Sequence, residues 1–542
     1  MMAAERSVAF TDRAGDYNFL GMHLRSIGVL LLTASALTAQ TTTGWQLVWS
    51  DEFNGSAGSP PDPSKWNYDL GGGGWGNGEA ETYTNLTQNV FQDGNGNLVI
   101  RAIRDSNGNY TSARLQTGSP GASTNTANGN WQYGRVVARI KLPYGQGVWP
   151  AFWMLGENFL TAGWPACGEI DIMENFGTYN NNSAVNNGTA HGPGYSGGDG
   201  ITKSYTLPFG QTVSSAYHVY AIEWSQNSIQ WSVDGVTFFT VTPASIPAGD
   251  QWVFNSPFFI LLNLAIGGPT TFLGQPNANA PFSPQDMLVD YVRVYQATNV
   301  AANTPVITPG SVVNAASFLG DLAPGGLATL TGVNLADAVY PISGDGGFPT
   351  SLAGVSVTVN GVAAPLVYLS PTQINFQMPW ETAPSTYVTI QMTRNAAVSA
   401  IEAVTVAADA APSMFLSDFT NGVAWVTGAG CVATECAVQA GGSYQLWANG
   451  LGPKNAPLTD GQVAVFQGSL TPLEVPGSPA SCDLTIGGQA AAVAYCGAAP
   501  GEIIDQVNFV YPAGVAASEP YVEATLTIGN ATGTFRVPAP AN

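Results

Sequence analysis

Short runs of alternating apolar and polar residues, or of β-branched and aromatic residues, constrain the fold of the first half of the chain. They lie between Trp45 and Gln296, turn residues bound each of them, and helical periodicity is nearly absent there. Side chains of a strand alternate between two faces, and Gly, Pro, Asn and Asp mark the turns. About 250 residues of this pattern predict a two-sheet β-sandwich. The runs are 97–104, 134–142, 218–225, 228–235, 258–268 and 287–296.

An internal repeat governs the C-terminal half. Segment 323–336 (“APGGLATLTGVNLA”) is similar to 439–453 (“QAGGSYQLWANGLGP”), and 355–380 is similar to 482–512. Two copies of about 100 residues predict two immunoglobulin-like β-sandwiches in tandem, which would serve as a spacer or attachment module or bind carbohydrate. The expected class is therefore all-β. The expected parts are a large domain at 43–297, a small, polar, proline-bearing linker at 298–309, and repeats at 310–402 and 403–540.

The N-terminal 39 residues have the pattern of an export signal. The stretch from Met22 has a short basic region with Arg25, an apolar run, and small residues before position 40. That run is too short to span a bilayer, and the polar residues ahead of it indicate that translation starts at Met22. No later run reaches the roughly 18 apolar residues of a membrane span. We expect an exported, bacterial, extracellular or surface-attached protein.

The charge balance excludes some partners. The 542 residues carry a formal net charge of −21, from 36 acidic and 15 basic side chains. Without a Lys/Arg cluster, binding to nucleic acid is disfavoured. The negative charge also repels anionic membrane surfaces and sulfated polymers, so a neutral substrate fits better. We expect a monomer that acts on such a substrate.

Four of the five cysteines form two pairs that are close in sequence. In an exported domain, close pairs of this kind predict disulfides. The fifth, Cys167, is expected to be a small buried residue rather than a catalytic thiol. No CxxC spacing indicates zinc. The expected pairs are Cys431 with Cys436 and Cys482 with Cys496.

The stretch “WPACGEIDIMENFG”, residues 164–177, places Glu169, Asp171 and Glu174 among apolar residues. Glu169 and Asp171 share one face of a strand, because faces alternate with period two. Strict alternation would turn Glu174 into the core, where a charge is costly. A β-bulge around Ile172–Met173 returns Glu174 to the face of the other two acids. We therefore predict a bulged strand with three acids in one row.

The spacing of this row favours glycoside chemistry. The bulge makes Glu169 and Glu174 effectively four positions apart, about 13 Å at the backbone. Their side chains can lean over Asp171 to a carboxyl separation of about 5–5.5 Å, which is typical of retaining glycosidases. Crowded acids titrate as a coupled unit and keep a proton near neutral pH. A solvated acidic strand face is the alternative, and the residues alone do not say which glutamate is the nucleophile.

“GEIDIMEN” resembles the active-site strand of glycoside hydrolase family 16 in its bulged, laminarinase-like form. The resemblance covers about residues 43–297 and implies a concanavalin-like β-jelly roll with an open cleft on its concave sheet. It also implies hydrolysis of β-glucan with retention of configuration. The other motifs that carry it are “LVWSDEFNG” (47–55), “GWGNGEAETYT” (74–84), “YGRVVARIKLPYGQGVWPAFWMLG” (133–156), “HGPGYSGG” (191–198), “YHVYAIEWS” (217–225) and “DYVRVYQ” (290–296).

The resemblance implies a role for each acid and a set of cleft residues. Glu169 matches the nucleophile, Glu174 the general acid/base, and Asp171 the assisting acid between them. Aromatic platforms are the expected floor of a sugar cleft, although core packing is the commoner role of a tryptophan and a structural role that of a histidine. The candidates for sugar binding are Asn77, Glu79, Arg135, Trp149, Trp153, Trp164 and His191.

One departure from the family pattern follows Gly267–Gly268. Relatives often carry a tryptophan here, whereas this chain reads “GGPTTFLGQPN”. Phe272 is the residue that could replace it. One sugar subsite and the fine choice of substrate therefore stay open.

The resemblance also implies a structural calcium away from the cleft. Glu52 and Asp290 match the acidic ligands of that site in relatives. Calcium takes oxygen ligands, and backbone carbonyls near Gly94 would complete the set. No cofactor is expected for catalysis.

These observations predict an exported retaining endo-β-1,3-glucanase that acts on laminarin-like polymers. Mixed-linkage β-1,3-1,4-glucan is a second expected substrate. Agar or carrageenan is less compatible with the negative net charge of the chain and with its laminarinase-like motifs. A non-catalytic glucan-binding protein on the same fold is one alternative, although all three acids are present. A surface adhesion protein built around the C-terminal repeats is the other.

Overall fold

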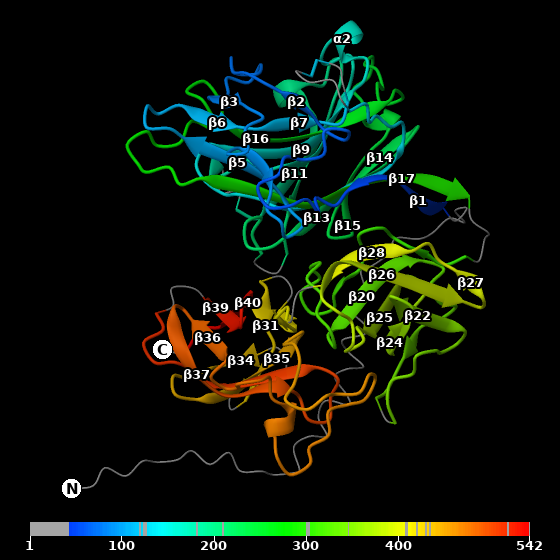
Figure 1. Cartoon of the computed structure of the whole chain (residues 1–542), viewed down its shortest axis with the longest axis vertical. Coiled ribbons are helices and arrows are strands. Elements are labelled where there is room, and N and C mark those ends of the chain that lie inside the picture. Colours follow the sequence, from blue (N-terminus) through cyan, green and yellow to red (C-terminus); the bar gives the residue numbers. More distant parts are fainter. Residues whose placement is uncertain are drawn as a thin grey trace.

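The computed structural model describes two stretches of the chain (Figure 1). The first is 43–299, without 119–120, 123–126, 180–182 and 209–210. The second is 304–540, without 345, 407–409, 419–420, 429–430, 433–434 and 517–519. The predicted export signal at residues 1–39 lies outside the described residues. Among the described residues, no helix is long and apolar enough to cross a membrane.

The first lobe is a sandwich of two sheets whose strands pair mainly in antiparallel fashion, as the alternating runs predict. Its larger sheet, here called the back sheet, has the order β15-β14-β13-β8-β17-β5-β6-β3, with β1 beside β17 and β4 beside β5. Its strands are β1 (Thr43–Asp51), β3 (Glu81–Tyr83), β4 (Val90–Gln92), β5 (Leu98–Arg104), β6 (Tyr110–Ser112), β8 (Gly134–Lys141), β13 (His218–Ser225), β14 (Ser228–Val233), β15 (Val236–Val241) and β17 (Gln285–Asn299).

The second sheet of this lobe, here called the cleft sheet, has the order β12-β11-β10-β9-β16-β7-β2. A continuous core of buried apolar side chains fills the space between the two sheets, which makes the lobe the expected jelly-roll sandwich. The strands are β2 (Asn67–Asp69), β7 (Arg114–Gln116), β9 (Val148–Gly156), β10 (Glu169–Glu174), β11 (Val185–His191), β12 (Ile201–Thr206) and β16 (Phe258–Ile266). The described helical turns of the chain are α2 (Phe159–Ala162), η3 (Gly197–Asp199), η4 (Pro243–Ser245) and η5 (Thr471–Leu473).

The first repeat forms a separate sandwich of two sheets. One has the order β18-β20-β25-β24-β21 with β19 beside β20, and the other has β23-β22-β26-β27 with β28 beside β26. Because β28 pairs with β26, this sandwich continues past the expected boundary at residue 402. Its strands are β18 (Val306–Ile307), β19 (Val313–Asn314), β20 (Leu327–Val333), β21 (Tyr340–Pro341), β22 (Val355–Val359), β23 (Val362–Ala364), β24 (Leu366–Leu369), β25 (Gln373–Gln377), β26 (Ser385–Arg394), β27 (Ala397–Val398) and β28 (Glu402–Val406).

The second repeat connects its strands into one continuous sheet. The order is β30-β31-β40-β39-β36-β37-β38-β35-β32-β33-β34, with β29 beside β35. Its strands are β29 (Ser413–Met414), β30 (Leu416–Asp418), β31 (Val423–Ala424), β32 (Val426–Gly428), β33 (Cys431–Val432), β34 (Glu435–Cys436), β35 (Ser443–Asn449), β36 (Cys482–Ile486), β37 (Gln489–Ala498), β38 (Asp505–Val510), β39 (Tyr521–Ile528) and β40 (Ala531–Pro538).

Both predicted disulfides are present, and both lie in the second repeat. They join Cys431 to Cys436 and Cys482 to Cys496. Cys167 is free and buried, as expected. The repeats also differ at one break. Pro365 separates β23 from β24 in the first repeat, because proline has no N–H for a sheet ladder, whereas β37 runs without interruption in the second.

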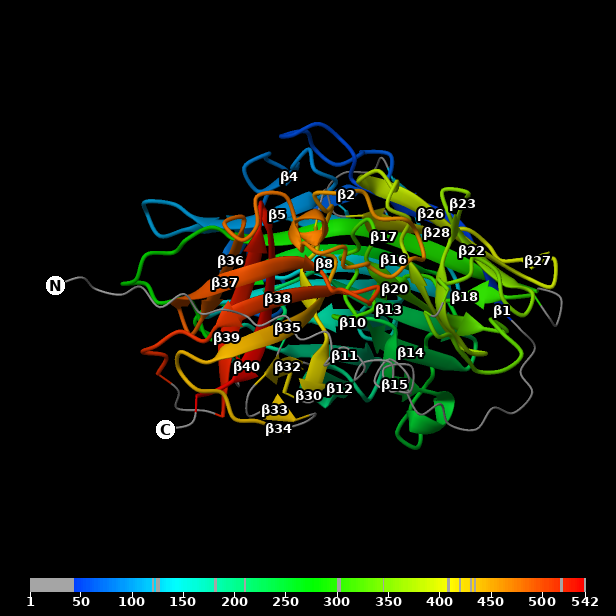
Figure 2. The ribbon, with the colours of Figure 1, turned by 90° about the horizontal axis from the view of Figure 1, so that it is seen from below.

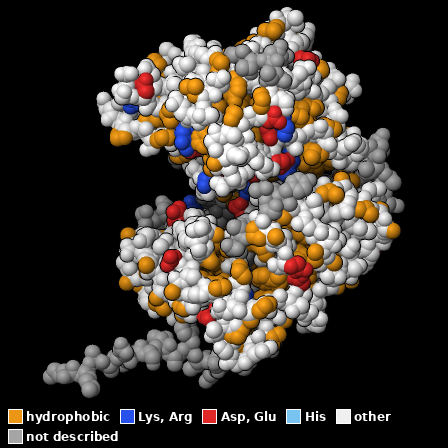
Figure 3. Space-filling model, in the orientation of Figure 1, with side chains coloured by type: hydrophobic (Ala, Val, Ile, Leu, Met, Phe, Trp, Pro, Cys, Tyr) orange, Lys and Arg blue, Asp and Glu red, His pale blue; other side chains and the backbone are white. Residues whose placement is uncertain are grey.

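The first repeat docks on the outer face of the back sheet (Figures 1 and 2). Two buried arginines of the back sheet reach into it. Arg139 pairs with Asp321 at 2.5 Å, and Arg293 donates to the backbone oxygen of Ala403 at 2.9 Å. A hollow separates the upper from the lower lobes on one side, and several charged side chains gather around it (Figure 3).

Candidate active site

The strand β10 is bulged at the predicted place. Glu169 lies opposite Leu155 of β9, and Glu174 lies opposite Ala151. Five steps along β10, from 169 to 174, therefore correspond to four steps along β9, from 155 to 151. The register shifts between Asp171 and Met173. The predicted bulge is confirmed.

The bulge sorts the residues of β10 by polarity. Ile170, Ile172 and Met173 are buried in the core between the two sheets. The three acids therefore face the other way, along one row of the cleft sheet. Four effective positions separate the two glutamates by about 13 Å at the backbone, so their side chains must lean inward to act on one bond.

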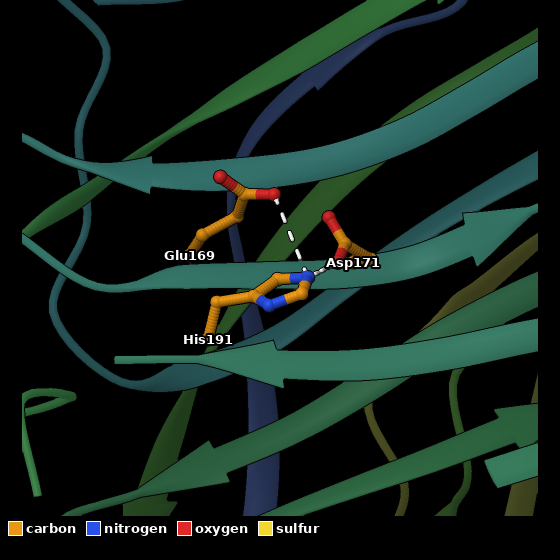
Figure 4. Close-up of side chains that lie close together, drawn as sticks. All are labelled: Glu169, Asp171 and His191. Carbon is orange, nitrogen blue, oxygen red and sulfur yellow. Dashed lines mark ion pairs between the residues drawn. The ribbon is translucent and has the colours of Figure 1, made fainter. Parts of the chain in front are cut away.

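His191 of β11 completes the row. Its main chain pairs with that of Glu169, and its ring lies between two of the acids (Figure 4). His191 Nε2 is 3.1 Å from Asp171 Oδ2 and 3.9 Å from Glu169 Oε1. The structure places His191 beside the acids, but its side chain is not among those that line the cleft. These three side chains are also the one group, within the described part of the chain, whose ligand atoms lie close enough together to hold a metal ion.

Two indoles hold the outer acids. Trp164 Nε1 donates to Glu169 Oε2 at 2.7 Å, and Trp149 Nε1 donates to Glu174 Oε1 at 3.0 Å. An N–H donor stabilises the ionised form of a carboxyl and fixes its rotamer. Both tryptophans therefore orient a reacting group as well as offering an aromatic face.

Burial raises the pKa of every acid in the row. The pKa of Glu169 rises to about 8, chiefly through burial and then through the charge of Asp171, while His191 and the Trp164 indole act in the opposite direction. Burial raises the pKa of Asp171 to about 7. The pKa of Glu174 lies well above its usual range, through burial and the nearby Asp171. The row thus retains protons at neutral pH.

The row opens into a cleft of about 420 Å³. This volume lies within the range of small-ligand sites, roughly 300–1,000 Å³. Its walls combine aromatic rings with polar side chains, as expected for a site that binds carbohydrate. The functional side chains that line it are Asp69, Trp75, Asn77, Glu79, Arg114, Gln116, Trp149, Trp153, Phe159, Trp164, Glu169, Asp171, Glu174 and Asn263.

Arg114 is a cleft residue that the sequence reasoning missed. Its guanidinium lies 5.0 Å from the ring of Trp75 and 4.8 Å from that of Trp153. It also pairs with Asp69 at 2.8 Å. Arg114 and Gln116 flank the apolar Leu115 in β7, so period-two alternation would have placed both polar side chains on one face.

Arg135 does not lie in the cleft. It belongs to β8 of the back sheet and pairs with Glu223 at 2.8 Å. Its neighbour Val136 packs in the core, so alternation turns Arg135 to the outer face of that sheet. In contrast, Asn77 and Glu79 line the cleft, and Asn77 Nδ2 donates to Glu79 Oε1 at 3.0 Å.

Phe272 lies beside the cleft residue Trp149, in the loop that follows Gly267–Gly268. Its ring is 5.5 Å from Trp149 and 5.3 Å from Tyr179, and 52% of the residue is exposed. The loop is close to the backbone of Gly78, since a Cβ at Gly268 would lie 2.1 Å from Gly78 oxygen. Phe272 therefore extends the aromatic surface beyond Trp149.

The residues expected to bind calcium do not fit such a site. Both carboxyl oxygens of Glu52 accept hydrogen bonds from Arg293, at 2.9 and 2.8 Å. Asp290 Oδ2 accepts a hydrogen bond from Arg139 at 2.7 Å. Guanidinium groups thus take the positions at which a cation would meet these acids, and neither acid is available as an unpaired ligand.

Comparison with known proteins places this lobe in a family. The sequence model of the glycosyl hydrolases family 16 matches residues 79–271. A β-glucanase of Rhodothermus marinus is 39% identical over 46% of this chain and 85% of its own length. The chain belongs to the glycosyl hydrolases of family 16.

Two further similarities each cover nearly half of the chain. The glucan endo-1,3-β-glucosidase A1 of Niallia circulans is 40% identical over 48% of this chain, and the match spans only 39% of that relative. The crystal structure of the laminarinase catalytic domain of Thermotoga maritima is 42% identical over 47% of this chain and 100% of that chain, with a TM-score of 0.41. The two C-terminal repeats lie outside the residues that the family model matches.

Proposed function

We propose that the protein is a retaining endo-β-glucanase that hydrolyses β-1,3-glucosidic bonds of laminarin-like glucans. The observation that carries this proposal is the bulged strand, which brings Glu169, Asp171 and Glu174 into one row at the floor of an aromatic cleft. The relatives named for β-glucan and β-1,3-glucan hydrolysis support the choice of substrate.

Glu169 reacts in its ionised form, which His191 and the Trp164 indole favour. In the first step, its carboxylate bonds to the anomeric carbon while the Glu174 proton passes to the leaving glycosidic oxygen. The bond between that carbon and oxygen breaks, and a covalent glycosyl-enzyme remains. The indole N–H groups of Trp164 and Trp149 hold the two carboxyls in place for this transfer.

In the second step, the Glu174 carboxylate takes a proton from a water molecule, whose oxygen bonds to the anomeric carbon. The ester bond to Glu169 then breaks. Two inversions at one carbon retain the configuration. Asp171, between the two glutamates and 3.1 Å from His191, orients Glu169 and adjusts its charge.

Reducing-sugar release from laminarin, lichenan, agarose and a β-1,4-glucan tests the proposal. The full chain should release sugar fastest from laminarin and more slowly from lichenan. Glu169→Gln keeps the shape of the row and should remove this activity. Activity on none of the polymers would favour the non-catalytic glucan-binding alternative, and unchanged activity in Glu169→Gln would contradict its role as nucleophile.

We further propose that the enzyme works outside the cell. The two disulfides of the second repeat support this location, because disulfides form and persist in oxidising compartments. Extraction of the protein from culture medium, compared with cytosol, tests it. Recovery of the protein only in the cytosol, with free thiols, would contradict the proposal.

A further inference from the structure

A directional chain of hydrogen bonds leads from the cleft floor to Glu79. Trp153 Nε1 donates to Asn263 Oδ1 at 2.8 Å, and Asn263 Nδ2 donates to the Tyr83 hydroxyl at 3.1 Å. The Tyr83 hydroxyl donates in turn to Glu79 Oε2 at 3.0 Å. Each hydrogen bond in this series runs in the same direction, and Glu79 is the final acceptor.

Glu79 is therefore an acceptor on both oxygens, because Asn77 Nδ2 donates to its Oε1. A second buried carboxyl lies beside it. Glu81 is 1% exposed, and its Oε2 accepts from the backbone N–H of Ile266 at 2.6 Å. Its Oε1 is buried, and no donor in the described part of the chain reaches it.

We propose that Glu79 and Glu81 share one proton, with the Glu81 hydroxyl donating to the Glu79 carboxylate, and that this pair positions the Trp153 ring in the cleft. The inference rests on the proposed function, since Trp153 is taken as a platform for a glucosyl ring. Glu81 touches no substrate and acts through Glu79, Tyr83 and Asn263, so it is a positioning residue.

The arrangement of donors and acceptors requires this proton. Two ionised carboxyls side by side in a buried site repel each other, and a proton between them converts the repulsion into a hydrogen bond. Burial, the hydrogen bond to Glu79 and the charge of Glu79 raise the pKa of Glu81 to about 9. Tyr83 interacts with both glutamates and with Arg114, which is already paired with Asp69.

The position of Trp153 connects this pair to catalysis. Trp153 lies opposite Asp171 in the pairing of β9 with β10, so its ring borders the catalytic row. Its indole N–H is held by the chain that ends on Glu79. Loss of the shared proton would leave two charges in the pair and disturb the acceptor on which the chain depends. We therefore expect weaker substrate binding above about pH 9, with a smaller effect on the chemical step.

Binding of a laminarin oligosaccharide, followed by tryptophan fluorescence in the full-length Glu169→Gln background, tests the inference between pH 6 and 10. Affinity should fall about tenfold as pH rises past 9. Adding Glu81→Gln supplies an N–H donor that does not titrate, so the fall in affinity past pH 9 should be absent. Adding Glu81→Leu, which has no donor, should weaken binding about tenfold at every pH. A flat profile without any change at Glu81, or equal affinities for the Gln and Leu variants, would overturn the proposal.

Infrared difference spectra at pH 7 test the shared proton without substrate. Glu81→Gln in the otherwise native full-length chain should remove one carbonyl band of a protonated carboxyl. Glu223→Gln, the same substitution on the outer face of the back sheet, should leave that band in place. No loss of a band in Glu81→Gln would overturn the inference. Loss of the band without any binding or hydrolysis of laminarin would instead overturn the proposed function.

Discussion

Buried acids have opposite surroundings on the two sheets of the hydrolase lobe. In the cleft, Glu169, Asp171 and Glu174 face one another and His191, and within the described part of the chain no lysine or arginine pairs with them. On the back sheet, Glu52 is held by Arg293. Asp290 is likewise held by Arg139. The back sheet balances its charges and gains stability, whereas the cleft crowds like charges and keeps protons that can be transferred.

The largest difference between the two regions should appear in activity. Glu169→Gln removes the proposed nucleophile, so kcat on laminarin should fall by at least about 10³-fold. Glu52→Gln lies on the far side of the sandwich and should keep kcat within about twofold. Initial rates of reducing-sugar release measure both. A comparable loss in the two variants would mean that the acids of the two sheets do not differ as described.

Thermal stability should fall in Glu52→Gln, the variant that keeps its activity. Glu52→Gln leaves the buried Arg293 without its carboxylate, and breaking a buried ion pair costs about 3–5 kcal/mol. The melting temperature of the hydrolase lobe should fall by roughly 5–10 °C. Calorimetry of the full chain measures this change. An unchanged melting temperature would show that the pair contributes nothing to stability.

Removal of a cleft acid should stabilise the lobe, and more so at higher pH. The pKa of Glu169 is raised in the folded state, so the native protein binds more protons than the unfolded chain between about pH 4.5 and 8. Wild-type stability therefore falls as pH rises through this range. Glu169→Gln should raise the melting temperature by a few degrees at pH 8 and hardly at all at pH 4. A gain that is independent of pH would contradict the raised pKa.

The smallest effect is expected from chelation. Because arginines already pair with Glu52 and Asp290, EDTA should shift the melting temperature by less than about 1 °C. Added calcium should not reverse the loss in Glu52→Gln. A shift of several degrees with EDTA that calcium restores would show that the lobe holds a structural cation.

Much of the fold and the acid row could be predicted from the sequence, because strand periodicity carries that information. Period-two alternation placed Glu169 and Asp171 on one face, and the cost of burying Glu174 required the bulge. The same alternation places Glu79, Glu81 and Tyr83 on one face, so their cluster could have been recognised. The internal repeat and the two disulfides could likewise be predicted from the sequence.

The errors concern contacts between segments that are distant in sequence. Alternation says which way Arg135 points within its strand, but not which of two sheets the strand joins. The pairing of Glu52 with Arg293 spans 241 positions, and no local pattern indicates it. Arg114 lies between two indoles because a loop and β9 meet there, which only the folded chain shows.

The configuration of the first product tests the central claim most directly. Proton NMR of laminari-oligosaccharide hydrolysis, recorded within the first minutes, separates the two anomers before mutarotation mixes them. A row of acids in which Glu169 attacks the sugar and Glu174 transfers the proton predicts the β-anomer first. Initial appearance of the α-anomer would mean that water attacks directly, and it would contradict the assignment of Glu169 as the nucleophile.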